Sequence, residues 1–448
     1  MSLRPLAVFT LLTWPTVGFL PSGHRPDNAP GPDEGGNGTG QKSSRHITAE
    51  LKKHKVDLGN ASSTGLRHSA RSTPGWQREG LDSFGIGTVY MLDRLNIGTP
   101  EQEISLILDT GSYTTLVDPD CSRAADSGAC REYGYYNTTE SFTSEALNVN
   151  FAAQFGTGYM EGSWYNDTIF IGQDKLPLRD SRVGVNSWST YLWAGIMGVS
   201  YGVRWNTAYP TILDLLVKYG YIEVPIFSLA IGTQVQGSSG PQGSIIFGGV
   251  NRWKYRGYLE PIEIWPNPSD QKAQFQQVGY WVNLTSFGFT APGQAQTTLT
   301  SDDFARTMLI DTGSTFTYLD ADLVSALAKQ FNAWIDERGV YYVNCELRSK
   351  NGYVNFGFNR GNMVIQVSYA DFIVDFDTYC ALGVQPADVG VATWVLGNSF
   401  IRAAYIVFDQ MNDAIWLAQY MPCDSEDISD LTPNAGKELW LDLTGLCW

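Results

Sequence analysis

The stretch LILDTGSYTTLV, residues 106–117, places an acidic residue directly after a run of aliphatic side chains. A second stretch, MLIDTGSTFTYL at residues 308–319, repeats this arrangement around another aspartate. Burying a carboxylate is costly unless hydrogen bonds compensate for the lost water. The glycine after each Asp-Thr lets the chain turn sharply, and the Thr and Ser hydroxyls supply hydrogen-bond donors. We therefore interpret Asp109 and Asp311 as one site rather than as two ordinary turn residues.

The two Asp-Thr-Gly-Ser stretches begin 202 residues apart, which indicates an internal repeat of long period. Each is followed by two apolar residues and a glycine, namely Gly198 and Gly397, which lie 87 and 84 residues beyond the glycines of the motifs. A repeated unit predicts two similar halves related by a pseudo-twofold axis, with a cleft where they meet. We place the junction of the halves near residues 250–260.

Short runs of β-branched and aromatic residues, separated by Gly and Asn turns, predict that strands dominate from residue 88 onward; NVNFAAQF, GSIIFGGV and AIWLAQY are examples. Helical patterns are few, and the clearest are residues 209–220 and 320–336, the second with Asp320 as N-cap. Within a leader rich in Pro, Gly and Ser, the segment ITAELKKHKVD at 47–57 is interpreted as a short helix. The expected fold class is all-β.

The chain is long enough, at 448 residues, to hold more than one domain-sized unit. Its formal net charge of −16 argues against a nucleic-acid partner, because phosphate binding requires a basic face. Residues 1–80 carry 10 Lys/Arg and 6 Asp/Glu, a net charge of +4, whereas the remaining 20 and 40 give −20. A basic leader on an acidic body suggests two pieces that attract each other; a disordered leader without a role is the alternative.

Several features favour the secretory route. Residues 1–18 resemble a signal peptide, with Arg4 before an apolar stretch that is too short, and too interrupted by Pro15, for a membrane anchor. Six cysteines without a CxxC motif predict three disulfides. Proximity selects one of 15 possible connectivities: Cys121–Cys130, Cys345–Cys380 and Cys423–Cys447. Glycosylation sequons occur at Asn37, Asn60, Asn137, Asn166 and Asn283.

All histidines lie in the leader, at positions 24, 46, 54 and 68. If the leader is removed, schemes that need a histidine base or a His-ligated zinc ion are excluded, and no cofactor is indicated. Carboxylates then remain as the candidate catalytic groups. At about 3 Å and an effective dielectric near 20, two ionised carboxylates repel by about 5 kcal/mol, so Asp109 and Asp311 are expected to share one proton. One would act as general base on a water and the other as general acid.

The chain resembles the pepsin-like aspartic endopeptidases, particularly the secreted fungal kind, over about residues 88–420. The resemblance rests on the order and spacing of NIGTPEQEISLILDTGS, QFGTGYMEGSWYNDTIFIG, AGIMGVSYG, GSIIFGGV, LIDTGSTFTYL and WVLGNSFIRAAYIVFDQMNDAIWLA. It implies a bilobal pepsin-like fold with Asp109 and Asp311 as the catalytic pair. The residues that it places around the pair are Thr110, Gly111, Ser112, Thr312, Gly313 and Ser314. The two threonines would brace the loops, and the two serines would bind the outer carboxylate oxygens.

The resemblance also implies how the chain is organised. The expected segments are a signal peptide (1–18), a propeptide or linker (19–80), an N-terminal lobe (81–255) and a C-terminal lobe (256–448). We expect a zymogen that becomes active at acidic pH, held by its own propeptide, monomeric, and acting on protein or peptide substrates. We expect neither a membrane span nor a nucleic-acid partner. The expected location is extracellular, with an acidic vacuole-like compartment as the alternative.

The flap departs from the family pattern. Members usually carry a Tyr there, hydrogen-bonded to a Trp that follows the first motif, whereas this chain has Phe155 and Leu116. The residues predicted to form the flap and the adjoining substrate pocket are Phe155, Gly156, Thr157, Gly158 and Ile107. Thr157 stands where some fungal members carry the Asp that accepts a basic residue, so we expect an apolar or aromatic preference. Ordinary core positions for Phe155 and Ile107 are the alternative, and a pepsin-fold binding or inhibitor protein without catalysis is the rival function.

Overall fold

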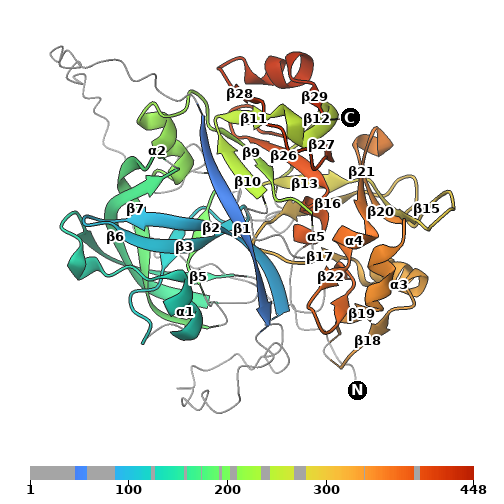
Figure 1. Cartoon of the computed structure of the whole chain (residues 1–448), viewed down its shortest axis with the longest axis horizontal. Coiled ribbons are helices and arrows are strands. Elements are labelled where there is room, and N and C mark those ends of the chain that lie inside the picture. Colours follow the sequence, from blue (N-terminus) through green and yellow to red (C-terminus); the bar gives the residue numbers. More distant parts are fainter. Residues whose placement is uncertain are drawn as a thin grey trace, which may run out of the picture. The chain divides into compact units, whose positions relative to one another are not determined.

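The computed structural model describes eleven segments: residues 46–57, 86–122, 127–155, 159–172, 174–190, 194–201, 209–233, 243–266, 279–337, 339–387 and 394–447. The predicted signal peptide, most of the leader and the sequons at positions 37 and 60 lie outside them. Strands predominate in the described part of the chain (Figure 1) and form one large sheet and four smaller ones.

The large sheet contains fourteen strands. In order across the sheet they are β29 (Gly445–Leu446), β12 (Tyr255–Glu263), β27 (Ala414–Tyr420), β26 (Ala404–Asp409), β9 (Ile226–Ala230), β10 (Gly243–Phe247), β1 (Ile47–Asp57), β2 (Ile86–Ile97), β3 (Gln102–Asp109), β8 (Ile196–Gly198), β4 (Thr115–Val117), β7 (Leu176–Thr190), β6 (Tyr159–Ile171) and β5 (Glu145–Gln154).

The smaller sheets and the helices complete the described part. One sheet pairs β11 (Gly249–Asn251) with β28 (Ile428–Asp430). The others contain β13 (Trp281–Leu284), β16 (Arg306–Ile310), β25 (Val395–Leu396), β17 (Thr317–Leu319) and β24 (Val384–Pro386); β15 (Gln296–Thr298), β14 (Ser286–Thr290), β20 (Tyr353–Phe358) and β21 (Met363–Ser368); and β18 (Trp334–Ile335), β19 (Tyr341–Val343), β23 (Cys380–Ala381) and β22 (Val374–Asp375). The helices are α1 (Ser127–Tyr133), α2 (Ile212–Lys218), α3 (Ala321–Gln330), α4 (Tyr369–Phe372), α5 (Asn398–Ile401) and α6 (Ala435–Lys437).

The two predicted helices are present but shorter than predicted. In α2, Thr211 and Asp214 form a capping box, and the buried positions of the helix face the core. Helix α3 ends at Gln330, and Asn332 just beyond it adopts a left-handed φ of 47° before the chain enters β18. Asp320 occupies the N-cap position of α3 but makes no side-chain cap bond; its carboxylate accepts from Arg306 and Trp394 instead.

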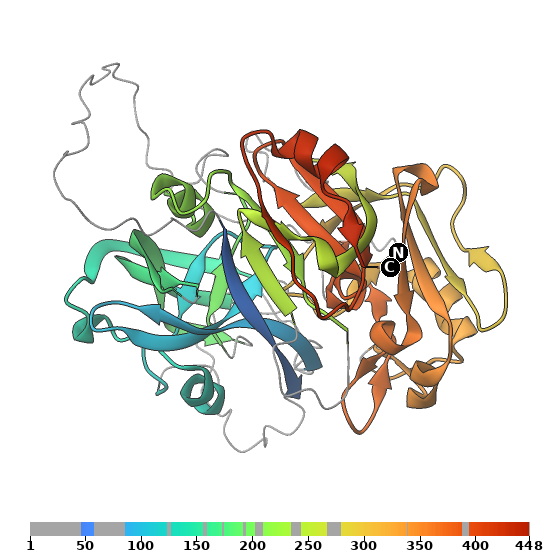
Figure 2. The same ribbon diagram turned by 45° about the horizontal axis from the view of Figure 1, so that its top comes forward.

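The helix predicted at 47–57 is wrong, because this segment is strand β1. It pairs antiparallel with β10 on one edge and with β2 on the other, and Figure 2 shows it in dark blue beside the yellow-green strands that include β10. Ile47 and Leu51 are buried. Their spacing of four residues fits one face of a helix and equally one face of a strand, so periodicity alone could not decide.

Corresponding ladders around the two motifs show the internal repeat. In the first half β3 pairs parallel with β8, which pairs antiparallel with β4. In the second half β16 pairs parallel with β25, which pairs antiparallel with β17. The amide of Ser200 donates to Ser112 O, and the amide of Asn398 donates to Ser314 O, at 2.9 and 2.8 Å. Each motif loop is thus held by the segment that follows β8 or β25 in its own half.

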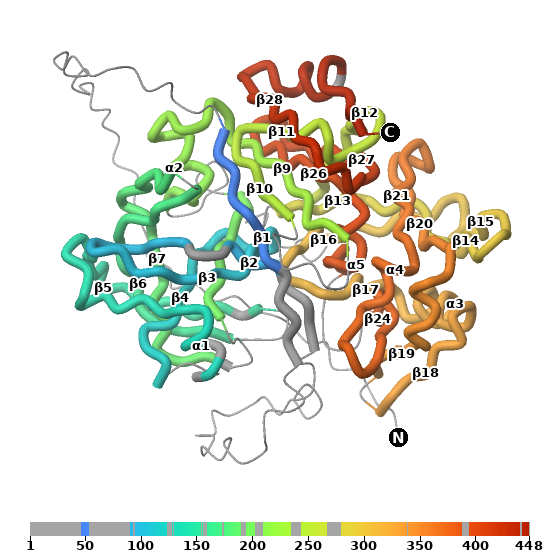
Figure 3. Tube along the Cα trace, in the orientation of Figure 1, coloured from blue at the N-terminus to red at the C-terminus, as the bar shows by residue number. Residues whose placement is uncertain are grey.

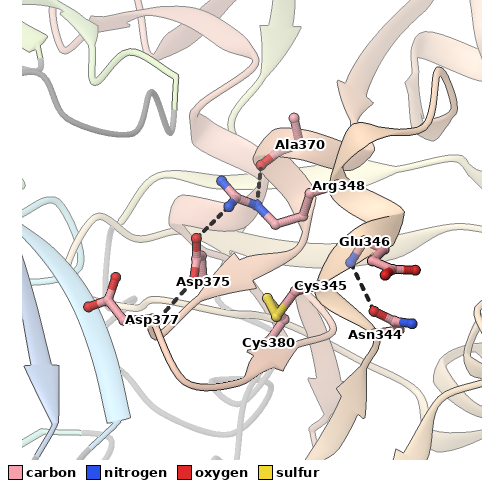
Figure 4. Close-up of a disulfide and its surroundings, with 8 residues drawn as sticks. All are labelled: Asn344, Cys345, Glu346, Arg348, Ala370, Asp375, Asp377 and Cys380. Atoms are coloured by element: carbon pink, nitrogen blue, oxygen red, sulfur yellow. Dashed lines mark hydrogen bonds and ion pairs between the residues drawn. A yellow bond between two sulfur atoms is a disulfide. The ribbon is translucent and has the colours of Figure 1, made fainter.

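The three disulfides predicted by proximity are the ones that the structure contains, with Cα–Cα distances of 5.4, 5.3 and 6.1 Å. Around Cys345–Cys380, Arg348 forms an ion pair with Asp375 and donates to the carbonyl of Ala370 (Figure 4). Cys423–Cys447 closes the terminal segment, red in Figure 3, whose strands pair with β11 and β12.

Gly198 allows β8 to approach the first motif closely. A Cβ at this position would lie 2.5 Å from Thr114 N and 2.6 Å from Ser112 O, and both atoms belong to the backbone. We expect Gly198→Ala to lower the free energy of unfolding by about 3 kcal/mol, since the loop must shift to avoid the clash. Gly436→Ala is the control, because its Cβ would meet side-chain atoms no closer than 3.4 Å. Urea denaturation of both variants checks this, and equal stabilities would contradict it.

Candidate active site

Two strands bring the aspartates of the repeated motif together. Asp109 is the last residue of β3, and Asp311 directly follows β16. The residues that precede them, Leu108 and Ile310, are fully buried. Asp109 is itself only 6% exposed, whereas Asp311 is partly exposed. The two strands, from different halves of the chain, therefore position both carboxylates at one site.

Each carboxylate has the same set of donors. The amides of Gly111 and Gly313 donate to Oδ1 of Asp109 and Asp311, respectively, both at 2.8 Å. The hydroxyls of Ser112 and Ser314 donate to the corresponding Oδ2 atoms at 2.5 and 2.7 Å. These bonds compensate for part of the water that the carboxylates lose.

The two motif glycines show how close the carboxylates lie. A Cβ on Gly111 would be 2.9 Å from Oδ1 of Asp311 and 3.1 Å from Oδ1 of Asp109. A Cβ on Gly313 would be 3.0 Å from Oδ1 of Asp109 and 3.1 Å from Oδ1 of Asp311. The Oδ1 atoms of both aspartates therefore face one another, and any side chain at either glycine would press on both.

The motif threonines brace the two loops reciprocally. The amide of Thr110 donates to Thr312 Oγ1 at 3.0 Å, and the amide of Thr312 donates to Thr110 Oγ1 at 3.1 Å. Each hydroxyl then donates to the strand opposite, Thr110 to Ile310 O at 2.8 Å and Thr312 to Leu108 O at 2.7 Å. Both threonines are fully buried, so this network fixes the relative position of the carboxylates without competition from water.

Burial and the neighbouring Asp311 carboxylate raise the pKa of Asp109 to about 8. Its hydrogen bonds from Ser112 and Gly111 act in the opposite direction but do not outweigh the loss of water. Burial and the charge of Asp311 also raise the pKa of the Tyr318 phenol. The pair therefore retains one proton from acidic to neutral pH.

Phe155 follows β5 and is partly exposed, while Ile107 on β3 is buried; both belong to one apolar cluster that also contains Leu116. Gly156, Thr157 and Gly158 lie outside the described residues. The sequons at Asn137, Asn166 and Asn283 are partly exposed, and their glycosylation stays a prediction.

The structure adds two aromatic residues that sequence reasoning missed. Tyr318 lies close enough to Asp311 to feel its charge, and Tyr113, next to the first motif, packs against the cluster that contains Phe155. Tyr113 follows Ser112 directly in the sequence, which could have drawn attention to it.

Within the described ranges, no three His, Cys, Asp or Glu side chains are grouped so as to hold a metal ion. No helix in this part is long and apolar enough to cross a membrane.

Comparison with known proteins agrees with this geometry. The family model for eukaryotic aspartyl proteases matches residues 90–420. The chain belongs to this pepsin-like family, whose fold is all-β with two lobes. It is 29% identical over 332 residues to gastricsin of Rattus norvegicus, covering 72% of this chain and 79% of the relative.

Two fungal relatives are similar to a comparable extent. The chain is 30% identical over 353 residues to a probable aspartic-type endopeptidase opsB of Aspergillus oryzae, covering 74% of this chain and 68% of that protein. It is 32% identical over 348 residues to aspartic proteinase yapsin-3 of Saccharomyces cerevisiae, covering 72% and 65%.

Removing one bracing hydroxyl should destabilise the site. We expect Thr312→Val to lower the free energy of unfolding by about 3 kcal/mol, because the Thr110 amide and the Leu108 carbonyl would both remain buried and unpaired. Thr298→Val on the exposed strand β15 is the control and should change stability by less than about 0.5 kcal/mol. Urea denaturation measures both, and a loss at position 312 no larger than at 298 would show that the brace is dispensable.

Proposed function

We propose that this protein is an aspartic endopeptidase that hydrolyses peptide bonds by activating a water molecule between Asp109 and Asp311. The observation that carries this proposal is the facing arrangement of two carboxylates with matched donors. A water held by such a pair can be deprotonated by one carboxylate while the other protonates the peptide carbonyl oxygen. No covalent intermediate is needed.

The difference in burial assigns the roles. Asp109, with its raised pKa, carries the proton and acts as general acid toward the carbonyl oxygen. Asp311 acts as general base and accepts a proton from the water. After the water attacks, Asp311 passes its proton to the leaving amine while Asp109 takes a proton back from a hydroxyl of the tetrahedral intermediate. The peptide bond breaks as the carbonyl re-forms, and the pair returns to its starting state with one proton. The bracing threonines hold this geometry while charge moves between the carboxylates.

The rival function is a pepsin-fold binding or inhibitor protein without catalysis, and Phe155 and Leu116 favour it, because the usual polar contact of the flap is missing. The complete set of carboxylates, serines and threonines favours the enzyme. A binding protein would not need two aspartates around one proton, and burying the Asp109 carboxylate costs stability.

We further infer that the protein is made as a secreted zymogen that acts at acidic pH on protein or peptide substrates. Strand β1 of the basic leader lies in the large sheet, and Nδ1 of His46 is within hydrogen-bonding distance of Oδ1 of Asp430 on β28, at 2.5 Å. Three disulfides suit an oxidising compartment. Acidification would protonate carboxylates of the −20 body and weaken its attraction for the leader.

The first test is hydrolysis of a fluorogenic peptide mixture between about pH 3 and 9 by the protein after leader removal, with Asp109→Asn alongside. We expect the substitution to lower kcat/KM by about 10³-fold, since Asn can neither carry nor exchange the shared proton. Wild-type activity should fall as pH rises through about 8, where the pair loses its shared proton.

Asp322→Asn on the exposed start of α3 is the matched control and should retain activity. Full activity of the Asp109→Asn variant would refute the assigned pair. If neither protein cleaves any peptide although both are folded and processed, the binding protein becomes the better interpretation.

A second buried carboxylate, that of Asp118, should make the folded state more stable at acidic pH than at neutral pH. Asp118 follows β4, is 1% exposed and accepts a hydrogen bond from Asn186 Nδ2 at 3.0 Å. Burial raises the pKa of Asp118 despite this bond.

Asp118→Asn should therefore make stability less dependent on pH. In the wild type, the folded state binds more protons at Asp118 than the unfolded state does. This difference stabilises the folded protein fully below the unfolded pKa of about 4. The stabilisation is lost as pH rises through the raised pKa of the folded state. The variant keeps an acceptor oxygen but does not ionise, so its stability relative to wild type should increase from acid to neutral pH. Parallel curves of unfolding free energy against pH would contradict this.

A further inference from the structure

The inner face of the flap hairpin is built from alternate residues of β5 and β6. Phe151, Ala153 and Phe155 alternate along one strand. Met160 and Trp164 occupy the buried face of the other, where the ladder pairs Ala153 with Met160. Period-two alternation places these side chains on one side of the hairpin. Phe155 packs against the apolar cluster that contains the other large side chains.

Trp164 and Leu116 share one space beneath this hairpin. Gly184 on β7 lies opposite Trp164 in the ladder, and a Cβ at Gly184 would lie 2.5 Å from Leu116, 2.8 Å from Phe151 and 3.1 Å from the Trp164 ring. The absence of a side chain at position 184 therefore makes room for the indole from β6 and for Leu116 from β4. The Phe151 and Trp164 ring centroids are 4.9 Å apart, so the rings are in contact.

The far side of the indole is also supported. The Trp164 and Tyr209 ring centroids are 5.4 Å apart, and the Arg182 guanidinium lies 4.5 Å from the centroid of the Tyr209 ring. Trp164 is only 4% exposed. Its ring is therefore enclosed between Phe151 and Tyr209, and a change in its size should be transmitted to the strand that carries it.

We propose that Trp164 on β6 is a flap-positioning residue. Its indole replaces the indole that related proteases carry at the position of Leu116. Through packing in the shared cluster it holds Phe155 in place. The inference rests on the proposed proteolytic function. It accounts for the simultaneous loss of the flap Tyr and of its Trp partner, since a flap fixed by apolar packing needs neither the hydroxyl nor the indole N–H that donates to it. The cluster thus still contains an indole, but this indole belongs to Trp164 on the flap hairpin and not to position 116 on β4.

The first experiment compares Trp164→Leu with Trp416→Leu in the processed protein. Trp416 is equally buried, at 5% exposed, but belongs to a different cluster. Amide hydrogen exchange across residues 147–165 should accelerate about 10-fold in Trp164→Leu and remain unchanged in Trp416→Leu. In peptide cleavage, kcat/KM should fall about 10-fold for the first variant only, mainly through kcat, because a loosened flap orients the substrate poorly.

The second experiment exchanges the two side chains. Leu116→Trp alone should lower the melting temperature, because two indoles would compete for the space beside Gly184. Combining it with Trp164→Leu should recover most of the melting temperature and bring kcat/KM to within about 3-fold of wild type, as a positive coupling between positions that share a space.

Several outcomes would overturn the proposal. A double variant as impaired as the sum of its parts would show that the two positions do not share a space. Unchanged flap exchange and unchanged kcat in Trp164→Leu, with lower stability alone, would reduce the indole to a core residue. If the wild type cleaves no peptide, the proposed function fails, but exchange and melting still decide whether Trp164 positions the flap.

Discussion

The rest of the structure depends on one electrostatic constraint, which is that two carboxylates whose Oδ1 atoms face one another cannot both be ionised. Burial raises the pKa of Asp109, so the pair keeps one proton, and the free energy that this requires is supplied by the surroundings. Two serine hydroxyls, two glycine amides and the threonine brace each come from a motif that the sequence carries twice. The internal repeat is therefore how a single chain builds a symmetric proton-sharing site.

Sequence reasoning could predict whatever a strong local pattern specifies. The doubled Asp-Thr-Gly-Ser motif indicated Asp109 and Asp311, and the three disulfides followed from proximity. Strand β1 was missed because Ile47 and Leu51 are spaced four residues apart, a spacing that helices and strands share. Tyr318 was missed because its relation to Asp311 is set by packing and not by a recognisable motif. Where no motif is repeated, local patterns do not show which distant residues meet.

The proposed flap departs from the family pattern at two positions, Phe155 and Leu116, and both residues belong to one apolar cluster. A hydrogen bond between flap and body fixes direction as well as distance, whereas apolar packing fixes distance and depends on shape. In this chain Leu116 leaves space that the ring of Trp164 shares beside Gly184. The position of a hairpin held in this way depends on how completely the cluster is filled. The cost of altering any one member therefore depends on the others.

The leader has a similar dependence on its surroundings. Residues 47–51 of β1 pair with β10 and residues 51–57 pair with β2, so β1 is hydrogen-bonded into the large sheet along its whole length. Removing it would expose the N–H and C=O groups of both neighbours, along with the apolar contacts of Leu51. The charge difference between leader and body can therefore account for only part of what holds the two together. Weakening that attraction with acid is insufficient by itself to release β1, because the hydrogen bonds of both ladders do not titrate.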